Sequence, residues 1–587
     1  MFTKRLPALL PALAAAALLT GPVTPHADAQ SAPRQTAASA PASASASLFP
    51  SDADLQVMLR YLVEDGATPG IVVGILEPDG STRILSHGSA GEGTRPLGRQ
   101  TVFEIGSINK TFTGTLLADM VARGEVKLDD PVQQYMPEGV RVPTRNGRQI
   151  TLLDLATHRS GLPRVPNNFV PADTGNPYAQ YSVQTVYDFL NGHELRRDIG
   201  AEYEYSNLGV GLLGIALGRA AGTSVKELIR ERIVEPLGMR MTSYEREGEI
   251  AAWLAKGRHS SGRQAPYWDA GEAIAGAGGL RANVEDMLLY LRAQLTPPDN
   301  ALGRAIRQAQ QVQHTFASGQ AIGLTWSVRD AGGRTILSHS GGTGGFNTYI
   351  GFDPERRTGI VMLTNTGGFE DDFAADFMMR GAPLSLPEVR VARDVLARYP
   401  GTYEVAPGRP MIVRLEDDGT MTVRVGGNVR FRMYAESDST FYLKRAPWRV
   451  RFTRDASGAV GGLVLDLGGT EQTARRVSDA TMPAAPVAPE VLDLPLTAVQ
   501  MAVYEGTYAL QAGGRTLEVR VFVQDGRLMA QPAGQSVTRL RAQGDHAFTF
   551  IPTADDRIRF VFTVEGGRAT SATLHQNGRA VQGARLP

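Results

Sequence analysis

Ser107 and Lys110 stand three positions apart in the segment 103–110, which reads FEIGSINK. Apolar side chains follow at four-residue spacing as far as Gly124, a common helix stop, so the pattern predicts a helix from Ser107 to Arg123. Positions i and i+3 share one helix face, so the hydroxyl and the amine are expected within reach of each other. A serine that gives its proton to a neighbouring amine can attack a carbonyl carbon, and the N–H groups of the helix start would stabilise the oxyanion.

Lysine is scarce in this chain, and the position of Lys110 is therefore informative. There are six lysines, and Lys110 is the one with a serine three residues before it. Arginine cannot lose its proton in a protein, so a lysine kept here is consistent with a need for an amine that can. Codon composition is the alternative explanation of the arginine bias, and the Ser-x-x-Lys pattern alone is a weak motif.

Composition limits the classes of function. The length of 587 residues predicts two to four domains, and 42% apolar with 20% charged residues is typical of globular protein. The formal net charge is zero, so no basic field is expected to bind nucleic acid. There is no cysteine, which excludes disulfides, thiolate metal sites and thiol catalysis. The histidines show no metal-binding spacing, and no metal or cofactor is predicted.

The N-terminus has the pattern of an export signal. A basic start, the apolar run 6–19 and the sequence ADA at 27–29 predict a secretory signal peptide over 1–29, cleaved near Ala29. The apolar run is short and contains prolines, so a membrane anchor is less favoured and no span is expected in the mature protein. We expect secretion, to a bacterial periplasm. The Ala/Ser/Pro-rich stretch 30–47 is predicted to be a disordered linker.

Strand patterns lie at both ends of the next region, and helix patterns lie between them. Alternating or apolar runs at 71–76 and 82–87 predict a first hairpin, and those at 335–339, 348–352 and 358–364 predict a final meander. This order predicts an α/β (α+β) domain, with an antiparallel sheet built from both ends of the segment and a helical insert. The chemical groups would lie in the cleft between the sheet and the insert.

Two further elements complete a set with Ser107. Tyr205-Ser206-Asn207 stands just before a predicted helix, and His339-Ser340-Gly341 stands at a predicted strand end. In their order the three elements resemble the serine β-lactamase and penicillin-binding-protein superfamily, closest to its class C-like branch, which also holds D-aminopeptidases, carboxypeptidases and esterases. The resemblance extends over 48–386. Other matching segments are LLDLATHRSGLP at 152–163, PLGM at 236–239 and AGGL at 277–280.

The resemblance implies a role for each residue. Ser107 would be the nucleophile that becomes acylated, and Lys110 and Tyr205 would share its proton as one coupled system. Asn207 would hold Lys110 and the substrate amide. The backbone N–H groups of Ser107 and Gly342 would form the oxyanion hole. No glutamate of the class A type is identifiable, so Tyr205 would also serve deacylation.

The third element departs from the family pattern. Many β-lactamases and penicillin-binding proteins have Lys-Thr-Gly where this chain has His339-Ser340-Gly341. A lysine supplies a fixed positive charge for a substrate carboxylate, whereas a histidine is mostly neutral at pH 7 unless perturbed. The change weakens the case for an efficient β-lactamase and favours D-aminopeptidase-like or esterase-like members. His158 is interpreted as structural, and no G-x-S-x-G supports an α/β-hydrolase.

The C-terminal third is predicted to be a duplicated all-β unit. YPGTY at 399–403 matches YEGTY at 504–508, and alternating strands with glycine turns follow each. We predict two small barrels, at 390–480 and 498–587, joined by a Pro/Ala-rich linker at 481–497. They resemble the lipocalin-like barrels appended to D-aminopeptidase-type members. A role in covering the active site and a purely stabilising role stay open.

The sequence therefore predicts a serine hydrolase that acts on small amides or esters, with D-amino-acid peptides as one substrate class. The runner-up is a carboxylesterase on the same scaffold. An interpretation of another class is a sensor that is acylated by β-lactams or peptides without turnover. The sequence makes no prediction of the oligomeric state.

Overall fold

An antiparallel sheet of eight strands forms the centre of the N-terminal domain in the computed structural model. The strand order is β2-β1-β10-β9-β8-β7-β6-β5, so β1 and β10, from opposite ends of the domain, are neighbours. This confirms the predicted sheet. The strand bounds are β1 Gly70–Leu76, β2 Thr82–Gly88, β5 His314–Thr315, β6 Ala321–Ile322, β7 Ser327–Asp330, β8 Thr335–Gly342, β9 Asn347–Asp353 and β10 Thr358–Thr364.

The structure describes most of the chain after its first segment. The described residues are 47, 49–64, 67–169, 171, 173, 175–259, 262–368, 373–380, 389–406, 409–425, 430–443, 448–455, 458–467, 470–479, 494–512, 515–524, 526–532, 538–550, 558–576 and 579–586. The predicted signal peptide and residues 30–46 of the predicted linker at 30–47 lie outside these residues, as does most of the linker at 481–497.

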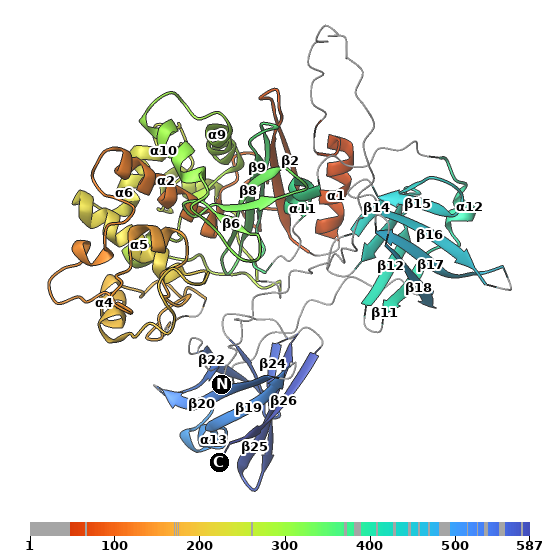
Figure 1. The fold of residues 1–587 in the computed structure, drawn as a ribbon. Coiled ribbons are helices and arrows are strands. Elements are labelled where there is room, and N and C mark those ends of the chain that lie inside the picture. The colour runs from red at the N-terminus through yellow and green to blue at the C-terminus, as the bar shows by residue number, and fades with distance from the viewer. Residues whose placement is uncertain are drawn as a thin grey trace, which may run out of the picture.

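Helices cover both faces of the sheet (Figure 1). The helical insert packs on one face, and α1 with α11 packs on the other. The insert approaches closely at Gly74 of β1, where an added Cβ would lie 2.6 Å from Val284 of α9. The helix bounds are α1 Asp52–Glu64, α2 Asn109–Ala122, α3 Leu152–Ala156, α4 Val183–Gly192, α5 Asn207–Ala221, α6 Val225–Ile229, α7 Gly248–Trp253, α8 Glu272–Ala275, α9 Val284–Leu295, α10 Ala301–Gln310 and α11 Phe373–Arg380.

Helix α2 is buried almost all round. Its buried residues include Lys110 and three threonines besides the apolar stripe predicted from the sequence. The threonine hydroxyls are paired, two with carbonyls of their own helical segment and Thr113 with the Gly276 carbonyl at 2.6 Å. A buried hydroxyl without a partner would be costly, so these bonds fix α2 against the loop that follows α8.

Local sequence sets the ends of α5. Ser206 is its N-cap, and the Ser206 hydroxyl accepts a hydrogen bond from the Gly209 N–H at 2.8 Å. The helix ends at Gly222, which has a left-handed φ of 71°. Among the described residues, no single helix is long and apolar enough to cross a membrane. By length and composition alone, the bent pair Asn207–Ala221 and Val225–Val234 meets that test.

Two closed eight-stranded barrels follow, as the duplication predicted. Both repeat one hydrogen bond: the hydroxyl of the second tyrosine of the motif donates to the carbonyl of the first, Tyr403 to Tyr399 and Tyr508 to Tyr504, at 2.7 Å each. Barrel 1 has strands β11 Gly401–Ala406, β12 Arg409–Leu415, β13 Met421–Val425, β14 Arg430–Ala435, β15 Thr440–Leu443, β16 Trp448–Arg454, β17 Val460–Leu467 and β18 Glu471–Ser478. Barrel 2 has strands β19 Gly506–Ala512, β20 Arg515–Gln524, β21 Arg527–Pro532, β22 Thr538–Gly544, β23 Ala547–Phe550, β24 Ile558–Glu565, β25 Arg568–Gln576 and β26 Arg579–Arg585.

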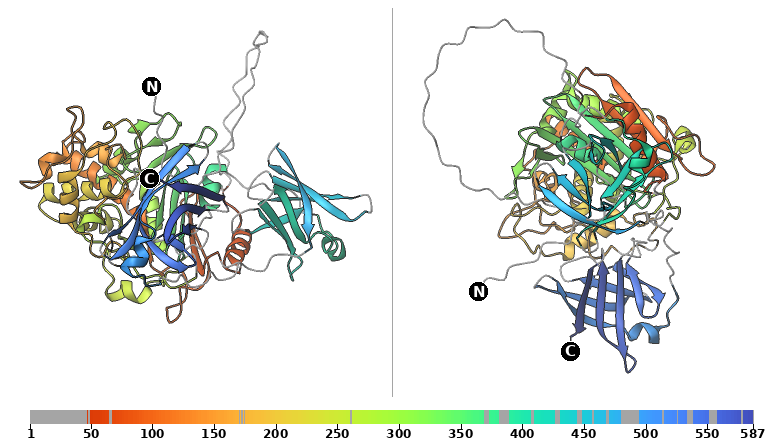
Figure 2. Two further views of the ribbon diagram at one scale, coloured as in Figure 1. Left: turned by 90° about the horizontal axis from the view of Figure 1, so that it is seen from below. Right: turned by 90° about the vertical axis from the view of Figure 1, so that its right-hand side faces the viewer.

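The two barrels lie on different sides of the N-terminal domain (Figures 1 and 2). Barrel 1 packs beside α1, and its apolar interior belongs to one core cluster with α1 and the outer sheet face. Polar contacts join the same elements: the Tyr434 hydroxyl donates to Asp54, and Arg60 pairs with Asp418 at 3.4 Å. Barrel 2 has a core cluster of its own.

Candidate active site

Ser107 and Lys110 meet as the spacing predicted. Ser107 lies in the short 3-10 turn Gly106–Ile108, which leads directly into α2, and Lys110 lies in the first turn of α2. The Lys110 Nζ is 3.0 Å from the Ser107 Oγ, which is hydrogen-bonding distance. The serine therefore has an amine placed to accept its proton.

Strand β8 lies directly against this turn because two glycines permit it. A Cβ on Gly106, whose φ is +53°, would lie 2.6 Å from the Gly342 N. A Cβ on Gly341 would lie 2.0 Å from the Ile105 carbonyl oxygen. Real side chains do not fit at such distances, so glycine at both positions brings the backbone of Gly342 beside Ser107. Gly341 thus sets the approach, and Gly342 lines the cleft with Ser107.

Lys110 is fully buried, and its second partner comes from the loop after α8. The Nζ donates to the Ala277 carbonyl at 2.7 Å. Burial, reinforced by the positive charge of Arg164, holds the pKa of Lys110 well below its usual range. Burial therefore favours the neutral amine, which is the form that can act as a base. Our expectation that Asn207 holds Lys110 differs from this geometry, in which the Ala277 carbonyl does so.

Tyr205 completes the cluster from the start of α5. Its ring centroid is 4.9 Å from the Lys110 Nζ, and its hydroxyl lies close enough to the Ser107 side chain to interact with it. Burial raises the pKa of Tyr205 well above its usual range, and the bond to Ser107 and the charge of Arg164 oppose that shift only in part. Tyr205 thus keeps its proton at neutral pH and is a hydrogen-bond donor beside the serine.

His158 packs against the ring of Tyr205, which is a structural contact of the kind predicted for it. The two ring centroids are 4.6 Å apart, and the His158 Nδ1 accepts the Ser206 N–H at 3.1 Å. Burial holds the pKa of His158 well below its usual range. The neutral ring therefore carries its proton on Nε2 and fixes the segment between Tyr205 and α5.

His339 stands beside Tyr205 and is neutral. The two ring centroids are 6.3 Å apart, and the His339 Nδ1 lies 2.7 Å from the Ser340 carbonyl oxygen. Burial lowers the pKa of His339 to about 4, and the nearby Lys110 adds to that shift. At pH 7 strand β8 therefore presents no positive charge where a lysine would present one.

A cleft of about 460 Å³ opens in front of Ser107. The Asn207 side-chain amide faces it and donates to the Tyr178 hydroxyl at 3.3 Å. The Asn207 Oδ1 is buried and has no hydrogen-bond partner among the described residues, so it is available to a substrate N–H. The full lining is Glu104, Gly106, Ser107, Tyr178, Asn207, Trp268, Asp269, Ala270, Ile274, Ala277, Gly278, Gly279, Gly342 and Thr343.

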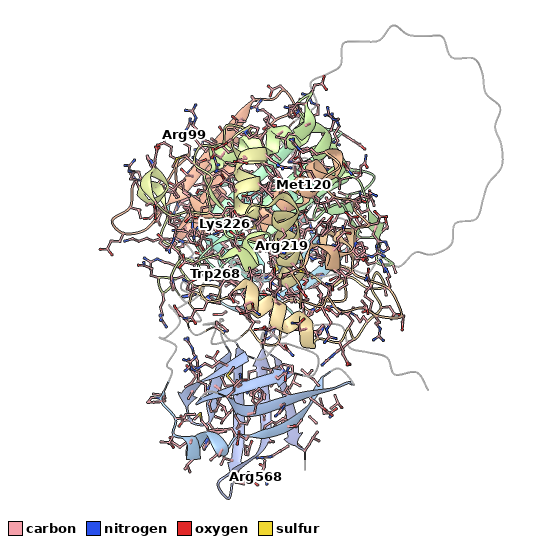
Figure 3. All side chains as sticks on the ribbon, turned by 90° about the vertical axis from the view of Figure 1, so that its left-hand side faces the viewer. Arg99, Met120, Arg219, Lys226, Trp268 and Arg568 are labelled. Atoms are coloured by element: carbon pink, nitrogen blue, oxygen red, sulfur yellow. The ribbon has the colours of Figure 1, made fainter. Side chains whose placement is uncertain are left out.

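Two aromatic residues of the cleft were not singled out by sequence reasoning. Tyr178 comes from the long segment after Pro163, and its ring centroid is 5.4 Å from that of Trp268. Trp268 lies on the side of the N-terminal domain that faces barrel 2 in Figure 3. Neither residue belongs to a short motif, and the one sequence signal, the richness of the segment after Pro163 in Pro, Asn and Tyr, concerns Tyr178 alone.

A buried ion pair fixes Trp268. Glu104 and Arg281 lie 3.3 Å apart, and both side chains are almost fully buried. Glu104 accepts the Trp268 N–H at 2.9 Å, and Arg281 donates to the Trp268 carbonyl at 2.7 Å. Within the described residues, no group of three or more His, Asp or Glu side chains could hold a metal ion.

Comparisons with known proteins agree on the N-terminal domain. A family model described as Beta-lactamase matches residues 55–381. The D-alanyl-D-alanine-carboxypeptidase/endopeptidase AmpH of Escherichia coli (strain K12) is 32% identical over 304 residues, which cover 49% of this chain and 77% of that protein. A Beta-lactamase of the same strain is 28% identical over 347 residues, which cover 52% of this chain and 86% of that protein.

Among solved structures, a Beta-lactamase/D-alanine Carboxypeptidase from Yersinia pestis complexed with citrate is similar to this chain. The identity is 26%, and the match covers 56% of this chain and 98% of that chain with a TM-score of 0.49.

Proposed function

Because the chain belongs to the beta-lactamase family, we propose that it is a serine hydrolase that cleaves small amides through an acyl-enzyme on Ser107, with D-amino-acid peptides as its substrate class. The observation that carries the proposal is the contact of Ser107 with a buried lysine 3.0 Å away. Removal from water without a nearby carboxylate favours the neutral form of this lysine, which can accept a proton. A charged surface lysine could not take this role at pH 7.

Acylation uses the protonation states of the resting site. The Ser107 Oγ attacks the substrate carbonyl carbon and passes its proton to the Lys110 Nζ. The oxyanion that forms accepts hydrogen bonds from the backbone N–H groups of Ser107 and Gly342. Asn207 accepts the N–H of the substrate through its buried Oδ1. Ser107, Gly342 and Asn207 all line the cleft.

Departure of the leaving group needs a proton donor, and Tyr205 is placed to be it. Its raised pKa keeps the hydroxyl protonated beside Ser107. Tyr205 gives its proton to the departing nitrogen and regains one from the Lys110 ammonium. The carbon–nitrogen bond breaks, and the acyl group stays on Ser107. Water then attacks the ester with the same two residues moving its proton, which restores the free serine.

The substrate class and the compartment are proposals with separate support. The similar Escherichia coli protein is named as a D-alanyl-D-alanine carboxypeptidase and endopeptidase, which favours D-alanyl peptides here. The export pattern of residues 1–29 supports a bacterial periplasm as the place of action. A carboxylesterase is the second candidate, because neutral His339 gives the site no fixed charge on strand β8. A sensor without turnover is less favoured, because both proton-transfer groups contact Ser107.

Hydrolysis of a matched amide and ester tests the proposal. We would measure release of D-alanine from diacetyl-lysyl-D-alanyl-D-alanine, and of p-nitrophenol from p-nitrophenyl acetate, by the unaltered protein and by Ser107→Ala. Ser81→Ala is the control, because Ser81 lies in the exposed turn after β1. We expect loss of both activities in Ser107→Ala alone. Full activity of Ser107→Ala on either substrate would refute the acyl-enzyme on Ser107, and ester hydrolysis without peptide hydrolysis would favour the carboxylesterase.

A further inference from the structure

The cleft has no obvious cation for the carboxylate at the end of a peptide. Its charged lining residues are Glu104 and Asp269, which are both acidic. Glu104 pairs with Arg281, and Asp269 pairs with Arg246. The Arg281 guanidinium also donates to three backbone carbonyls, so its charge and its N–H groups are engaged. His339, on strand β8, is neutral.

Arg164 is an exposed cation that lies against one of the reacting residues. Its Cζ lies 5.0 Å from the ring centroid of Tyr205, and the Lys110 Nζ lies 4.9 Å from the same centroid. Its charge also acts on Lys110, Tyr178 and Tyr205. The guanidinium charge thus influences the pKa values of residues that surround Ser107.

The backbone of Arg164 is held in place, although its side chain is exposed. The Arg164 carbonyl accepts the N–H of Asn207 at 2.9 Å and that of Leu208 at 3.1 Å. These are orphan donors at the start of α5, so the bonds tie Arg164 to the helix that carries Asn207. Any motion of the side chain therefore starts from a fixed point at the start of α5, next to Asn207, which lines the cleft.

The Arg164 guanidinium has no carboxylate partner among the described residues. Its one side-chain interaction there is with the face of the Tyr205 ring. Stacking on an aromatic face uses none of the five N–H donors of a guanidinium. These donors form a planar fork that matches a carboxylate, which is the group that Arg binds in two-pronged fashion.

A peptide with one residue after the cleaved bond would place its terminal carboxylate close to Ser107. The hydroxyl of Tyr205 interacts with Ser107, while the Arg164 guanidinium lies over the ring of the same side chain. The terminal carboxylate of such a peptide is one residue beyond the cleaved carbonyl, a span of roughly 3.8 Å. Tyr205 is a neighbour of both Ser107 and Arg164, so the two groups that such a substrate residue would contact lie on either side of one side chain.

We propose that Arg164 binds the C-terminal carboxylate of the substrate, so that the site selects peptides with a free terminal acid after the cleaved bond. The inference rests on the proposed function. Arg164 supplies the positive charge for the carboxylate, because strand β8 has no lysine to supply it. The alternative role is purely electrostatic: the positive charge favours neutral Lys110 and acts on every substrate alike.

Paired substrates separate the two roles. We would measure kcat and KM for diacetyl-lysyl-D-alanyl-D-alanine, for its C-terminal amide and for p-nitrophenyl acetate. The variants are Arg164→Gln, Arg164→Lys and the control Arg304→Gln, which removes an exposed guanidinium from α10. For Arg164→Gln we expect kcat/KM on the free acid to fall about 10- to 100-fold, mostly through KM, as for a lost charged hydrogen bond. The amide and the ester should change less than about threefold, and Arg164→Lys should keep part of the preference for the acid.

Equal losses on acid, amide and ester in Arg164→Gln would overturn the inference and leave the proposed function intact, because they would show a general electrostatic effect. Unaltered protein that cleaves the ester and neither peptide would refute the peptidase function, and this inference with it. A preference for the acid that Arg164→Gln retains in full would also overturn the inference.

Discussion

Replacement of Lys110 by arginine separates a basic amine from a mere positive charge. Lys110→Arg places a long, permanently cationic side chain at a fully buried site next to Ser107. A guanidinium stays protonated at all accessible pH values, so it cannot accept the serine proton. Lys110→Met has a similar length, carries no charge and cannot accept a proton either. Both variants should lose acylation for the same reason.

The magnitude follows from the lost base. General base catalysis contributes about 10²- to 10⁴-fold, which is roughly 3 to 5 kcal/mol of activation free energy. Lys110→Arg adds a second cost, because the site has a carbonyl partner but no carboxylate for a permanent charge. An uncompensated buried charge costs about 3–5 kcal/mol of folding free energy. Lys110→Met avoids that charge, so it reports the chemical loss in a folded protein.

The assay is kcat/KM for p-nitrophenyl acetate and for a D-alanyl-D-alanine peptide, with thermal unfolding as the check of folding. Lys127→Arg is the control, because it makes the same exchange at an exposed position. We expect a loss of about 100-fold or more in Lys110→Arg and in Lys110→Met, and no loss in Lys127→Arg. Folded Lys110→Arg with activity within about threefold of the unaltered protein would refute Lys110 as the base.

Three further outcomes follow from the same contacts. Folding lowers the pKa of Lys110, so between the folded pKa and the unfolded pKa of about 10.4 the unfolded chain binds one more proton than the folded protein. The free energy of unfolding should therefore rise with pH in that range, by at most about 1.4 kcal/mol per pH unit. Urea unfolding from pH 7 to 10 should show this rise in the unaltered protein relative to Lys110→Met, and parallel curves would contradict it. Gly341→Ala should lower Tm by about 2 to 10 °C, because the added Cβ would lie 2.0 Å from a backbone carbonyl oxygen. In the control Gly342→Ala the added Cβ meets no atom within 4 Å, so this variant should unfold near the Tm of the unaltered protein. Glu104→Gln should lower the free energy of unfolding by about 3–5 kcal/mol, because it leaves buried Arg281 without its carboxylate, and it should raise KM by releasing Trp268. The control Glu285→Gln breaks an exposed ion pair and should change the free energy of unfolding by less than about 1 kcal/mol. Equal effects of the two variants would contradict the role of the buried pair.

The sheet and the barrels could be predicted because their patterns are local and repeated. Strand β1, for example, is apolar throughout and buried on both faces, and the turn 77–80 separates it from β2. Capping residues also set helix ends where they were expected, as Asn283 does for α9. The repeated tyrosine motif marked the duplication, because each copy makes the same internal hydrogen bond.

The contacts of the site could be predicted only where one element supplies both partners. Ser107 and Lys110 share a helical turn, and sequence spacing alone places them together. The Ala277 carbonyl and Tyr178 come from segments far away in the chain, so tertiary packing decides that they meet Lys110 and Asn207. The direction of the pKa shift of Lys110 likewise depends on burial, which the pattern of α2 did not show.

The central claim is that Ser107 forms the acyl-enzyme, and trapping that intermediate tests it most directly. The protein would be mixed with a fluorescent penicillin or a D-alanyl-D-alanine thioester, quenched in acid, digested and sequenced by mass spectrometry. We predict the acyl mass on the peptide that contains Ser107, and no adduct in Ser107→Ala. An adduct on another residue, or an equal adduct in Ser107→Ala, would contradict the account.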